Sequence, residues 1–267
     1  MKHQPIGIFD SGLGGLTVAK AIQKELPSET LIYFGDTARI PYGTKSPDTI
    51  IRYSLQIARF LIKKEKIKCL VVACNTASAW ALNDLRREFQ IPILGVIEPG
   101  AQAAIDATRN NRIGVIGTEG TVESGAYVEA IRRLRPKAKV LMKACPLFVP
   151  LVEEGKLSGS VTESVALEYL KPLLKEKIDT LVLGCTHYPL LKKTLSRLAG
   201  SKIRIVDSAT ETAKSLHRNL EMQGIELSGR GGSKYFVSDL SRKFKEQAQR
   251  FLGRPIHRVE KVFIEKY

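Results

Sequence analysis

Leu70-Val71-Val72-Ala73-Cys74 and Leu181-Val182-Leu183-Gly184-Cys185 are two apolar runs of strand length, and each ends on a cysteine. Small polar side chains follow at once, Asn75-Thr76 after the first run and Thr186-His187 after the second. Parallel α/β sheets carry their active groups at the carboxyl ends of strands, where loops meet helix N-termini. The two segments therefore predict a pair of thiols that face each other across one cleft. Such a pair suits a reaction that needs an acid and a base on opposite sides of a carbon, such as stereochemical inversion of a carbon acid.

Strand-like and helix-like segments alternate from one end of the chain to the other, which is the pattern of βαβ crossovers and mainly parallel sheets. We therefore expect an α/β fold. The predicted strands are Ile6–Phe9, Leu31–Gly35, Cys69–Ala73, Ile93–Ile97, Ile113–Ile116, Val140–Lys143, Thr180–Gly184 and Ile203–Val206. The predicted helices are Leu16–Leu26, Thr49–Glu65, Ala77–Glu88, Thr121–Arg135, Thr162–Lys175 and Pro189–Leu198.

A weak internal repeat indicates two similar halves. The segment 6–12 aligns with 113–119 at an offset close to that of the two cysteine segments. The chain crosses between the halves near Glu98-Pro99-Gly100, read as turn residues after a strand, and again near Val206-Asp207-Ser208. We expect one domain from 1–97 plus 208–267 and a second from 98–207, with pseudo-symmetric parallel sheets and the active site in the cleft between them.

The composition is that of an ordinary globular protein, with 43% hydrophobic and 26% charged residues among 267. No apolar stretch approaches a membrane span, and the start, Met1-Lys2-His3-Gln4-Pro5, does not resemble the core of a signal peptide. We therefore expect a cytoplasmic protein with no membrane partner. The net charge of +15 invites a nucleic-acid interpretation, but the basic residues are scattered and no nucleic-acid-binding motif accompanies them. Nucleic acid is not an expected partner.

The four cysteines do not form metal-ligand or disulfide patterns. Without a secretory context, disulfides are not expected. Cys185-Thr186-His187 offers too few ligands for a tetrahedral zinc site, so no metal site is expected. Cys69 and Cys145 have the character of packed small hydrophobic residues.

The segment Asp10–Thr17 joins the first strand to the first helix and is rich in glycine. A dinucleotide-binding fingerprint requires glycine where Thr17 stands, so a Rossmann cofactor site is rejected. Two interpretations stay open for Ser11: it binds a substrate carboxylate at the helix start, or it caps the helix beside closely packed glycines.

A second loop, Gly35–Gly43, leaves the second strand. Asp36 is either a structural turn residue or a carboxylate that reaches into the cleft. Tyr42 offers a hydroxyl and Gly43 a backbone amide, and both groups are good partners for a carboxylate.

Cys74 and Cys185 are the most informative residues, although a cysteine at a strand end is usually inert packing. Because helix N-termini lower thiol pKa values, we expect both pKa values to be tuned toward neutrality. A reversible two-base enzyme needs one thiolate and one thiol at the same time. His187 is a natural proton partner for Cys185, since histidine titrates near neutral pH.

At these residues the chain resembles the cofactor-independent aspartate/glutamate racemase superfamily, and the glutamate racemases in particular. The resemblance runs in family order from residue 6 to about 210, whereas the strong basicity and the tail after Ile225 match nothing specific. The matching segments are Asp10-Ser11-Gly12-Leu13-Gly14-Gly15, Asp36-Thr37-Ala38-Arg39, Pro41-Tyr42-Gly43, Ala73-Cys74-Asn75-Thr76-Ala77, Glu98-Pro99-Gly100 and Gly184-Cys185-Thr186-His187-Tyr188-Pro189.

The resemblance implies that Cys185 removes the α-proton of L-glutamate while Cys74 returns a proton on the other face, with the roles exchanged in reverse. Similar enzymes supply D-glutamate for peptidoglycan. The resemblance also implies assistance from Asp10 to Cys74 and from His187 to Cys185, with Asp36 and Glu153 as supporting carboxylates. The substrate-binding positions that it implies are Asp10, Ser11, Pro41, Tyr42, Gly43, Asn75, Thr76, Thr118, Thr121, Thr186 and His187.

No cofactor is expected, so the carbanion must be stabilised by hydrogen-bond donors at the substrate carboxylate in a closed cleft. The motif positions carry no basic side chain except Arg39, so neutral dipoles are expected to bind both carboxylates. The expected partners are glutamate as a small-molecule substrate and a second copy of the chain in a homodimer. An aspartate racemase, whose substrate is one methylene shorter, stays open as an alternative. A basic binding protein that has lost catalysis is the alternative from another class.

Overall fold

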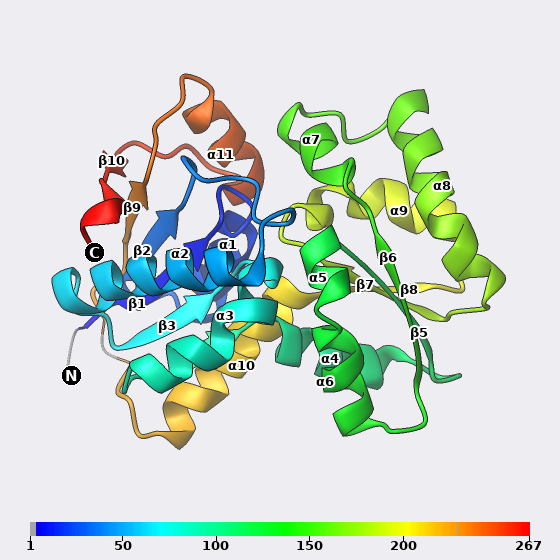
Figure 1. Cartoon of the computed structure of the whole chain (residues 1–267), viewed down its shortest axis with the longest axis horizontal. Helices are drawn as coiled ribbons and strands as arrows, with labels where there is room; N and C mark the ends of the chain where they lie inside the picture. Colours follow the sequence, from blue (N-terminus) through cyan, green and yellow to red (C-terminus); the bar gives the residue numbers. More distant parts are fainter. Residues whose placement is uncertain (1–3, 228) are drawn as a thin grey trace.

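The protein was analysed as a computed structural model, which describes residues 4–227 and 229–267. Residues 1–3, at the start of the N-terminal stretch discussed above, lie outside the described residues, as does residue 228. The chain forms two α/β lobes, each built on a wholly parallel sheet (Figure 1). Within the described part of the chain, no helix has both the length and the apolar content needed to cross a membrane.

The first sheet has six strands in the order β10-β9-β2-β1-β3-β4, and the second has four in the order β6-β5-β7-β8. The strands of the first sheet are β1 (Ile6–Asp10), β2 (Leu31–Gly35), β3 (Cys69–Val72), β4 (Ile93–Gly95), β9 (Ser233–Val237) and β10 (Glu260–Lys261). Those of the second are β5 (Arg112–Gly117), β6 (Lys139–Ala144), β7 (Thr180–Gly184) and β8 (Arg204–Asp207).

The two sheets repeat one topology, as the internal sequence repeat predicts. In each, the first strand lies between the second and the third, and the fourth follows the third. The registers also correspond, because Ile6 pairs with Cys69 in the first sheet and Ile113 pairs with Thr180 in the second. Both cysteine segments therefore end at equivalent corners of equivalent sheets, which is the placement that the fold prediction requires.

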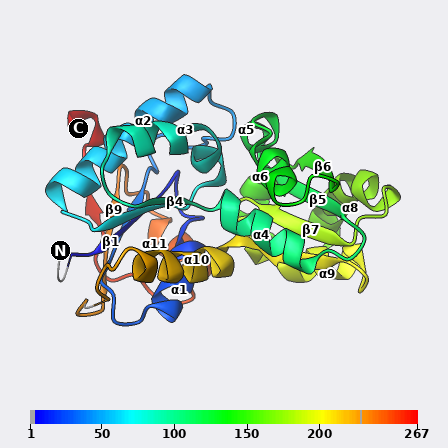
Figure 2. The same ribbon diagram turned by 90° about the horizontal axis from the view of Figure 1, so that it is seen from below.

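Helices cover both faces of each sheet (Figures 1 and 2). In the first lobe, one face is covered by α2 (Pro47–Arg59), its π-helical extension (Phe60–Lys64) and α3 (Asn75–Glu88). The opposite face is covered by α1 (Leu16–Glu25), α10 (Ser208–Met222) and α11 (Phe244–Leu252). A short 3₁₀ helix (Ile264–Lys266) ends the chain and packs near α2.

In the second lobe, one face is covered by α4 (Ile97–Ala107) and α6 (Ala126–Leu134). The short helix α5 (Glu119–Glu123), which precedes α6 in the chain, lies at the edge near the first lobe (Figure 1). The other face is covered by α8 (Ser160–Lys175) and α9 (Lys192–Ala199), with α7 (Phe148–Glu153) and a 3₁₀ helix (Tyr188–Leu191) alongside. One apolar cluster contains residues of both lobes, from Ile8 in β1 to Leu183 in β7, and so joins them on the side of α1, α8 and α10.

Several sequence predictions about elements are corrected by the structure. The single helix predicted over Thr121–Arg135 is two helices, because Gly125 takes a left-handed conformation (φ 66°) between α5 and α6. The helix predicted from Pro189 begins as a 3₁₀ turn, and its α-helical part starts at Lys192. The helix predicted over Thr49–Glu65 changes to π-helical pairing at Phe60.

The crossing at Glu98-Pro99-Gly100 is also different from the prediction. The strand predicted to reach Ile97 ends at Gly95, and Glu98, Pro99 and Gly100 form the first turn of α4. Proline is tolerated in a first helical turn, where its missing N–H has no helical partner to lose. The alternating pattern over His257–Phe263 yields only the two-residue β10, whereas β9, which was not predicted, pairs with β2.

Candidate active site

Cys74 and Cys185 line one cavity of about 300 Å³ between the lobes. Cys74 follows β3 and caps the N-terminus of α3, where its Sγ accepts a hydrogen bond from the Ala77 amide at 3.5 Å. Cys185 follows β7 in the second lobe. Both side chains are buried and neither forms a disulfide. The cavity size lies at the lower end of the range for ligand pockets, so it fits a small molecule.

Burial changes the proton affinity of both thiols in the direction opposite to the sequence prediction. Desolvation raises the pKa of Cys74 to about 11, against the weaker lowering effect of the Ala77 amide and Ser11. Desolvation also raises the pKa of Cys185, and the charges of Cys74 and Asp10 add to the rise. The expectation of thiol pKa values near neutrality is therefore wrong, because burial outweighs the helix N-terminus.

A relay of side chains leads from Cys185 to the edge of the cavity. The Sγ atom of Cys185 lies 4.0 Å from Nδ1 of His187, and Nε2 of His187 lies 3.1 Å from Oε1 of Glu153 at the end of α7. His187 is buried and Glu153 is partly exposed. An imidazole between a thiol and a carboxylate can take up a proton and be stabilised as a cation.

Asp10 lies beneath the cavity and does not line it. The residue is fully buried at the end of β1, where its carboxylate accepts hydrogen bonds from the Gly12 amide at 2.9 Å and the Thr186 hydroxyl at 3.4 Å. Burial raises the pKa of Asp10, while the charge of His187 and these hydrogen bonds oppose the rise. Asp10 thus connects the loop that follows β1 to Thr186 in the other lobe, and its influence on both thiols is electrostatic.

Asp36 also points away from the cavity. Its carboxylate accepts hydrogen bonds from the Arg39 guanidinium at 2.8 Å, from the Tyr42 hydroxyl and from the Ser238 hydroxyl at 2.7 Å. Of the two interpretations left open, the structural one describes its position: Asp36 organises the loop that presents Tyr42 and Gly43 to the cavity. Arg39 is held by Asp36 and Gln56 and does not line the cavity either.

Contacts between threonine hydroxyls join the two lobes at the cavity. Thr76 at the start of α3 lies 2.9 Å from Thr118 and 3.3 Å from Thr121, both in the second lobe. Thr76 and Thr118 line the cavity, whereas Thr121 lies behind them, bonded to Thr118.

Asn75 carries a hydrogen-bond donor without a partner. Its Oδ1 accepts from the Tyr127 hydroxyl at 2.8 Å, which fixes the orientation of the amide. Its Nδ2 is buried at the cavity and finds no hydrogen-bond partner within the described residues. An unsatisfied buried donor costs about 1–3 kcal/mol, so Nδ2 of Asn75 has the capacity to bind a further acceptor.

Among the described residues, none of those that line the cavity is Lys or Arg. The lining instead combines neutral polar side chains with apolar residues and the carboxylates of Glu119 and Glu153, and the binding of the substrate carboxylates by neutral dipoles stays a prediction. Sequence reasoning did not assign several of the lining residues, although the resemblance implied a role for Glu153. These residues are Gly12, Ile40, Thr44, Glu119, Pro146, Val149 and Pro150.

Two glycines permit the close approach of the lobes around this cavity. A Cβ atom at Gly14 would lie 2.2 Å from Oγ1 of Thr186 and 2.5 Å from Nδ1 of His187. A Cβ atom at Gly43 would lie 2.8 Å from Cβ of Thr118. The glycine-rich segment after β1 thus makes room for side chains of the opposite lobe.

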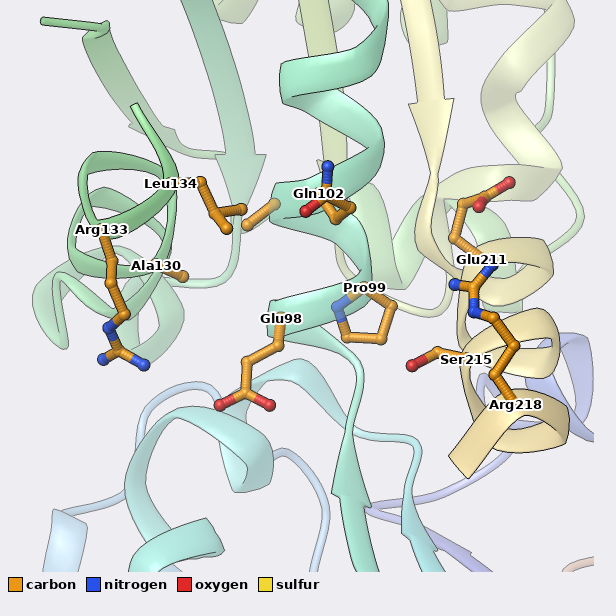
Figure 3. A pocket seen from close by; sticks show the side chains of 10 residues that line it. Glu98, Pro99, Gln102, Ala130, Arg133, Leu134, Glu211, Ser215 and Arg218 are labelled. Carbon is orange, nitrogen blue, oxygen red and sulfur yellow. The ribbon is translucent and has the colours of Figure 1, made fainter. Parts of the chain in front are cut away.

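A second cavity of about 310 Å³ lies between α4, α6 and α10 (Figure 3). It is lined by residues of mixed charge, among them Glu98, Arg133, Glu211 and Arg218. The cavity contains no cysteine or histidine. Acid–base chemistry at carbon therefore points to the cavity that holds the two thiols.

Comparisons with known proteins agree with this geometry. The model of the family described as Asp/Glu/Hydantoin racemase matches residues 15–216. A curated glutamate racemase from Geobacter metallireducens is 54% identical over 269 residues, covering 99% of this chain and 98% of the relative. The chain therefore belongs to the Asp/Glu/hydantoin racemase family.

Solved structures place the chain more closely within this family. A glutamate racemase isoform from Bacillus anthracis superposes with a TM-score of 0.94 at 41% identity, over 98% of each chain. A glutamate racemase from Francisella tularensis, solved in complex with D-glutamate, has a TM-score of 0.94 at 37% identity over the full length of both chains. Within the family, the chain groups with the glutamate racemases.

Proposed function

We propose that the protein interconverts L- and D-glutamate by a two-base mechanism in which Cys74 and Cys185 exchange protons with the α-carbon. The observation that carries the proposal is the arrangement of two free, buried thiols, one from each lobe, on a single small cavity. A planar carbanion between two such groups can lose a proton to one face and gain a proton on the other. Inversion of configuration is the direct result.

The proton steps follow from this placement. In the L-to-D direction, the thiolate of Cys185 takes the α-proton, and the thiol of Cys74 gives its proton to the opposite face. The reverse reaction exchanges the two roles. After each turnover the proton balance of the two thiols is inverted, so it must be restored through solvent or through the neighbouring acid–base groups.

The raised pKa values require a route to the thiolate. Both thiols are protonated at neutral pH, because burial penalises the charged form. His187 supplies the route for Cys185: Nδ1 accepts the thiol proton, and the carboxylate of Glu153 stabilises the imidazolium through Nε2. The charge of Asp10 raises the pKa of Cys74 further, so it favours the thiol form of Cys74 that gives up its proton in the L-to-D direction.

Neutral donors would hold the two carboxylates of glutamate. The unpaired Nδ2 of Asn75 supplies one donor, and the hydroxyls of Ser11, Thr76 and Thr118 line the same cavity. Fixed donors at the α-carboxylate stabilise the negative charge that develops when the α-proton leaves, and they need no reorganisation during the reaction. The resemblance to glutamate racemases further supports a role for the product D-glutamate in peptidoglycan synthesis.

Circular dichroism of purified protein mixed with L-glutamate or L-aspartate tests the substrate. We expect the ellipticity of L-glutamate to decay to zero and that of L-aspartate to decay at least about tenfold more slowly, since one methylene is worth about 1–3 kcal/mol in a pocket. Faster decay of L-aspartate would favour an aspartate racemase. No decay with either amino acid, together with salt-sensitive retention of a labelled DNA duplex, would favour the basic binding protein.

A further inference from the structure

The tail of the chain, which sequence analysis left unassigned after Ile225, returns to the Cys185 side of the active site. Phe251 of α11 packs its ring against the imidazole of His187, with ring centroids 5.1 Å apart and planes at 80°. Phe251 is buried, and it belongs to a helix that packs on α1 in the first lobe. Figure 1 shows α11 at the edge of that lobe, opposite α7 of the second.

The same helix also holds the far end of the relay. The Glu153 carbonyl accepts hydrogen bonds from Nη1 of Arg250 at 3.0 Å and from Nε2 of Gln247 at 3.3 Å. The Arg250 guanidinium lies so close to Gly155 that an added Cβ there would be 2.9 Å from Nη1. Three residues on one side of α11, Gln247, Arg250 and Phe251, therefore contact both the ring of His187 and the backbone that carries Glu153.

Three neighbours restrict the imidazole ring of His187. The Gly14 backbone lies against Nδ1 and Cε1, Glu153 bonds Nε2, and Phe251 covers the ring itself. The gap between Nδ1 and the Cys185 sulfur is already 4.0 Å, at the outer limit of a hydrogen bond to sulfur. A small rotation of the imidazole would break this contact.

We propose that Phe251 is a positioning residue for proton transfer at Cys185, acting through the orientation of His187. The inference deepens the proposed function and rests on it. An aromatic ring set edge-on to the imidazole restricts its rotation, and a flexible aliphatic side chain would leave it free to turn. Because small misplacements of catalytic groups cost large factors in rate, loss of this contact should slow the proton transfers made by Cys185.

The test uses substrate deuterium isotope effects, which report the two thiols separately. A racemisation has an equilibrium constant of one, so kcat/KM must fall equally in both directions for any variant. With α-deuterated L-glutamate, however, the deuteron leaves to Cys185, and with α-deuterated D-glutamate it leaves to Cys74. If proton transfer at Cys185 becomes slower, removal of the deuteron from L-glutamate becomes more rate-limiting. Removal of the deuteron from D-glutamate by Cys74 becomes less rate-limiting, because the later proton transfer from Cys185 is then the slow step.

We expect Phe251→Leu to lower kcat/KM about ten- to a hundredfold. The isotope effect should rise with α-deuterated L-glutamate and fall with α-deuterated D-glutamate. Phe244→Leu is the matched control, because Phe244 is equally buried on the same helix but no ring contact joins it to His187 among the described residues. The control should leave both isotope effects unchanged.

Phe251→Met, which keeps most of the volume without the ring, replaces Phe251→Leu if that variant does not fold. Two results would overturn the positioning role. One is that both isotope effects of Phe251→Leu equal those of the wild-type protein. The other is that the Phe244→Leu control shows the same opposite shifts. Absence of racemisation by the wild-type protein would instead overturn the proposed function, so the two failures are distinct.

Discussion

At the scale of single residues, desolvation sets the chemistry of the two thiols. Cys74 stands at a helix N-terminus, which favours a thiolate, yet the net effect of its surroundings raises its pKa to about 11. Such a group is a competent proton donor at neutral pH, and it becomes a strong base once deprotonated. Both thiols are therefore protonated at neutral pH. In the proposed mechanism, the proton of Cys185 leaves through His187.

Replacement of either thiol tests the proposed roles. We expect Cys74→Ala and Cys185→Ala each to lower the rate of racemisation by about a hundred- to ten-thousandfold or more, because a positioned acid or base contributes that much. Cys69→Ala is the control, since Cys69 is buried in β3 outside the cavity lining. Wild-type turnover by either active-site variant, measured by circular dichroism with L-glutamate, would exclude the two-thiol mechanism.

Asn75 offers a second test at this scale. In Asn75→Asp the unpaired donor becomes an acceptor that repels the substrate carboxylates, so we expect KM for glutamate to rise about ten- to a hundredfold. Tyr127→Phe keeps the amide of Asn75 but removes the hydroxyl that bonds Oδ1 and Ser208, and it should raise KM less. Steady-state kinetics of both variants gives the comparison, and an unchanged KM in Asn75→Asp would place the carboxylates elsewhere.

At the scale of elements, the C-terminal segment supports the site from behind. Ser238, directly after β9, donates to Asp36 at 2.7 Å and accepts from the Ala38 amide at 2.9 Å. Asp36 in turn holds Tyr42 and Arg39. The loop between β2 and α2 is thus fixed by a strand that is two hundred residues away in the sequence.

Removal of this support should affect substrate binding. We expect Ser238→Ala to raise KM several-fold and to lower the free energy of unfolding by about 1 kcal/mol, the usual worth of one hydrogen bond. Ser233→Ala, at the other end of β9, removes a buried hydroxyl that has no partner within the described residues, so it should leave KM unchanged and should not lower the free energy of unfolding. Equal effects of the two substitutions on KM would contradict the supporting role of Ser238.

The elements that could be predicted from sequence are those with continuous apolar runs. β1, β2, β3 and β7 are buried throughout, and their sequences are apolar except for Asp10 at the end of β1 and Thr180 at the start of β7. β9 escaped prediction because it lies near the sheet edge, begins with Ser233-Lys234 and follows glycines that indicate a loop. The break at Gly125 escaped because hydrophobic periodicity continues on both sides of it.

Only the site residues that follow a predicted strand could be predicted from the sequence. Cys74, Cys185 and His187 stand directly after strands, where position along the chain determines position in space. The inward or outward orientation of Asp36 depends on Arg39 and Ser238, and Ser238 reaches it only through the tertiary fold. The contact of Phe251 with His187 depends on the same long-range return of the chain.

At the scale of the whole molecule, the lobes are in contact around the cavity. The Gly120 amide donates to the Gly43 carbonyl at 2.8 Å, and the Trp80 indole donates to the Gly120 carbonyl at 2.9 Å. A single residue of the second lobe is thus bonded by two segments of the first, the loop at Gly43 and α3. The homodimer and the cytoplasmic location expected from the sequence stay predictions.

Buried thiols make the stability of the molecule fall at alkaline pH. Burial raises the pKa of Cys69 from 9.0 to about 12. The thiol of the unfolded chain ionises above about pH 9, whereas the folded thiol stays protonated until the pH approaches 12. The stabilising contribution of Cys69 is therefore complete below about pH 9. Between these two values, the free energy of unfolding falls by about 1.4 kcal/mol per pH unit. Urea unfolding between pH 8 and pH 10 should show a shallower decline for Cys69→Ala than for the wild type, and parallel curves would contradict the assigned burial effect.

The central claim is that two separate thiols serve the two faces of one carbon, and partial racemisation of L-glutamate in D₂O tests it most directly. Mass spectrometry of the separated enantiomers at low conversion should find deuterium at the α-carbon of nearly all D-glutamate and of very little recovered L-glutamate, because each thiol serves one face. Recovered L-glutamate labelled as fast as the product would indicate a single base, and unlabelled D-glutamate would exclude proton exchange with solvent-equilibrated thiols.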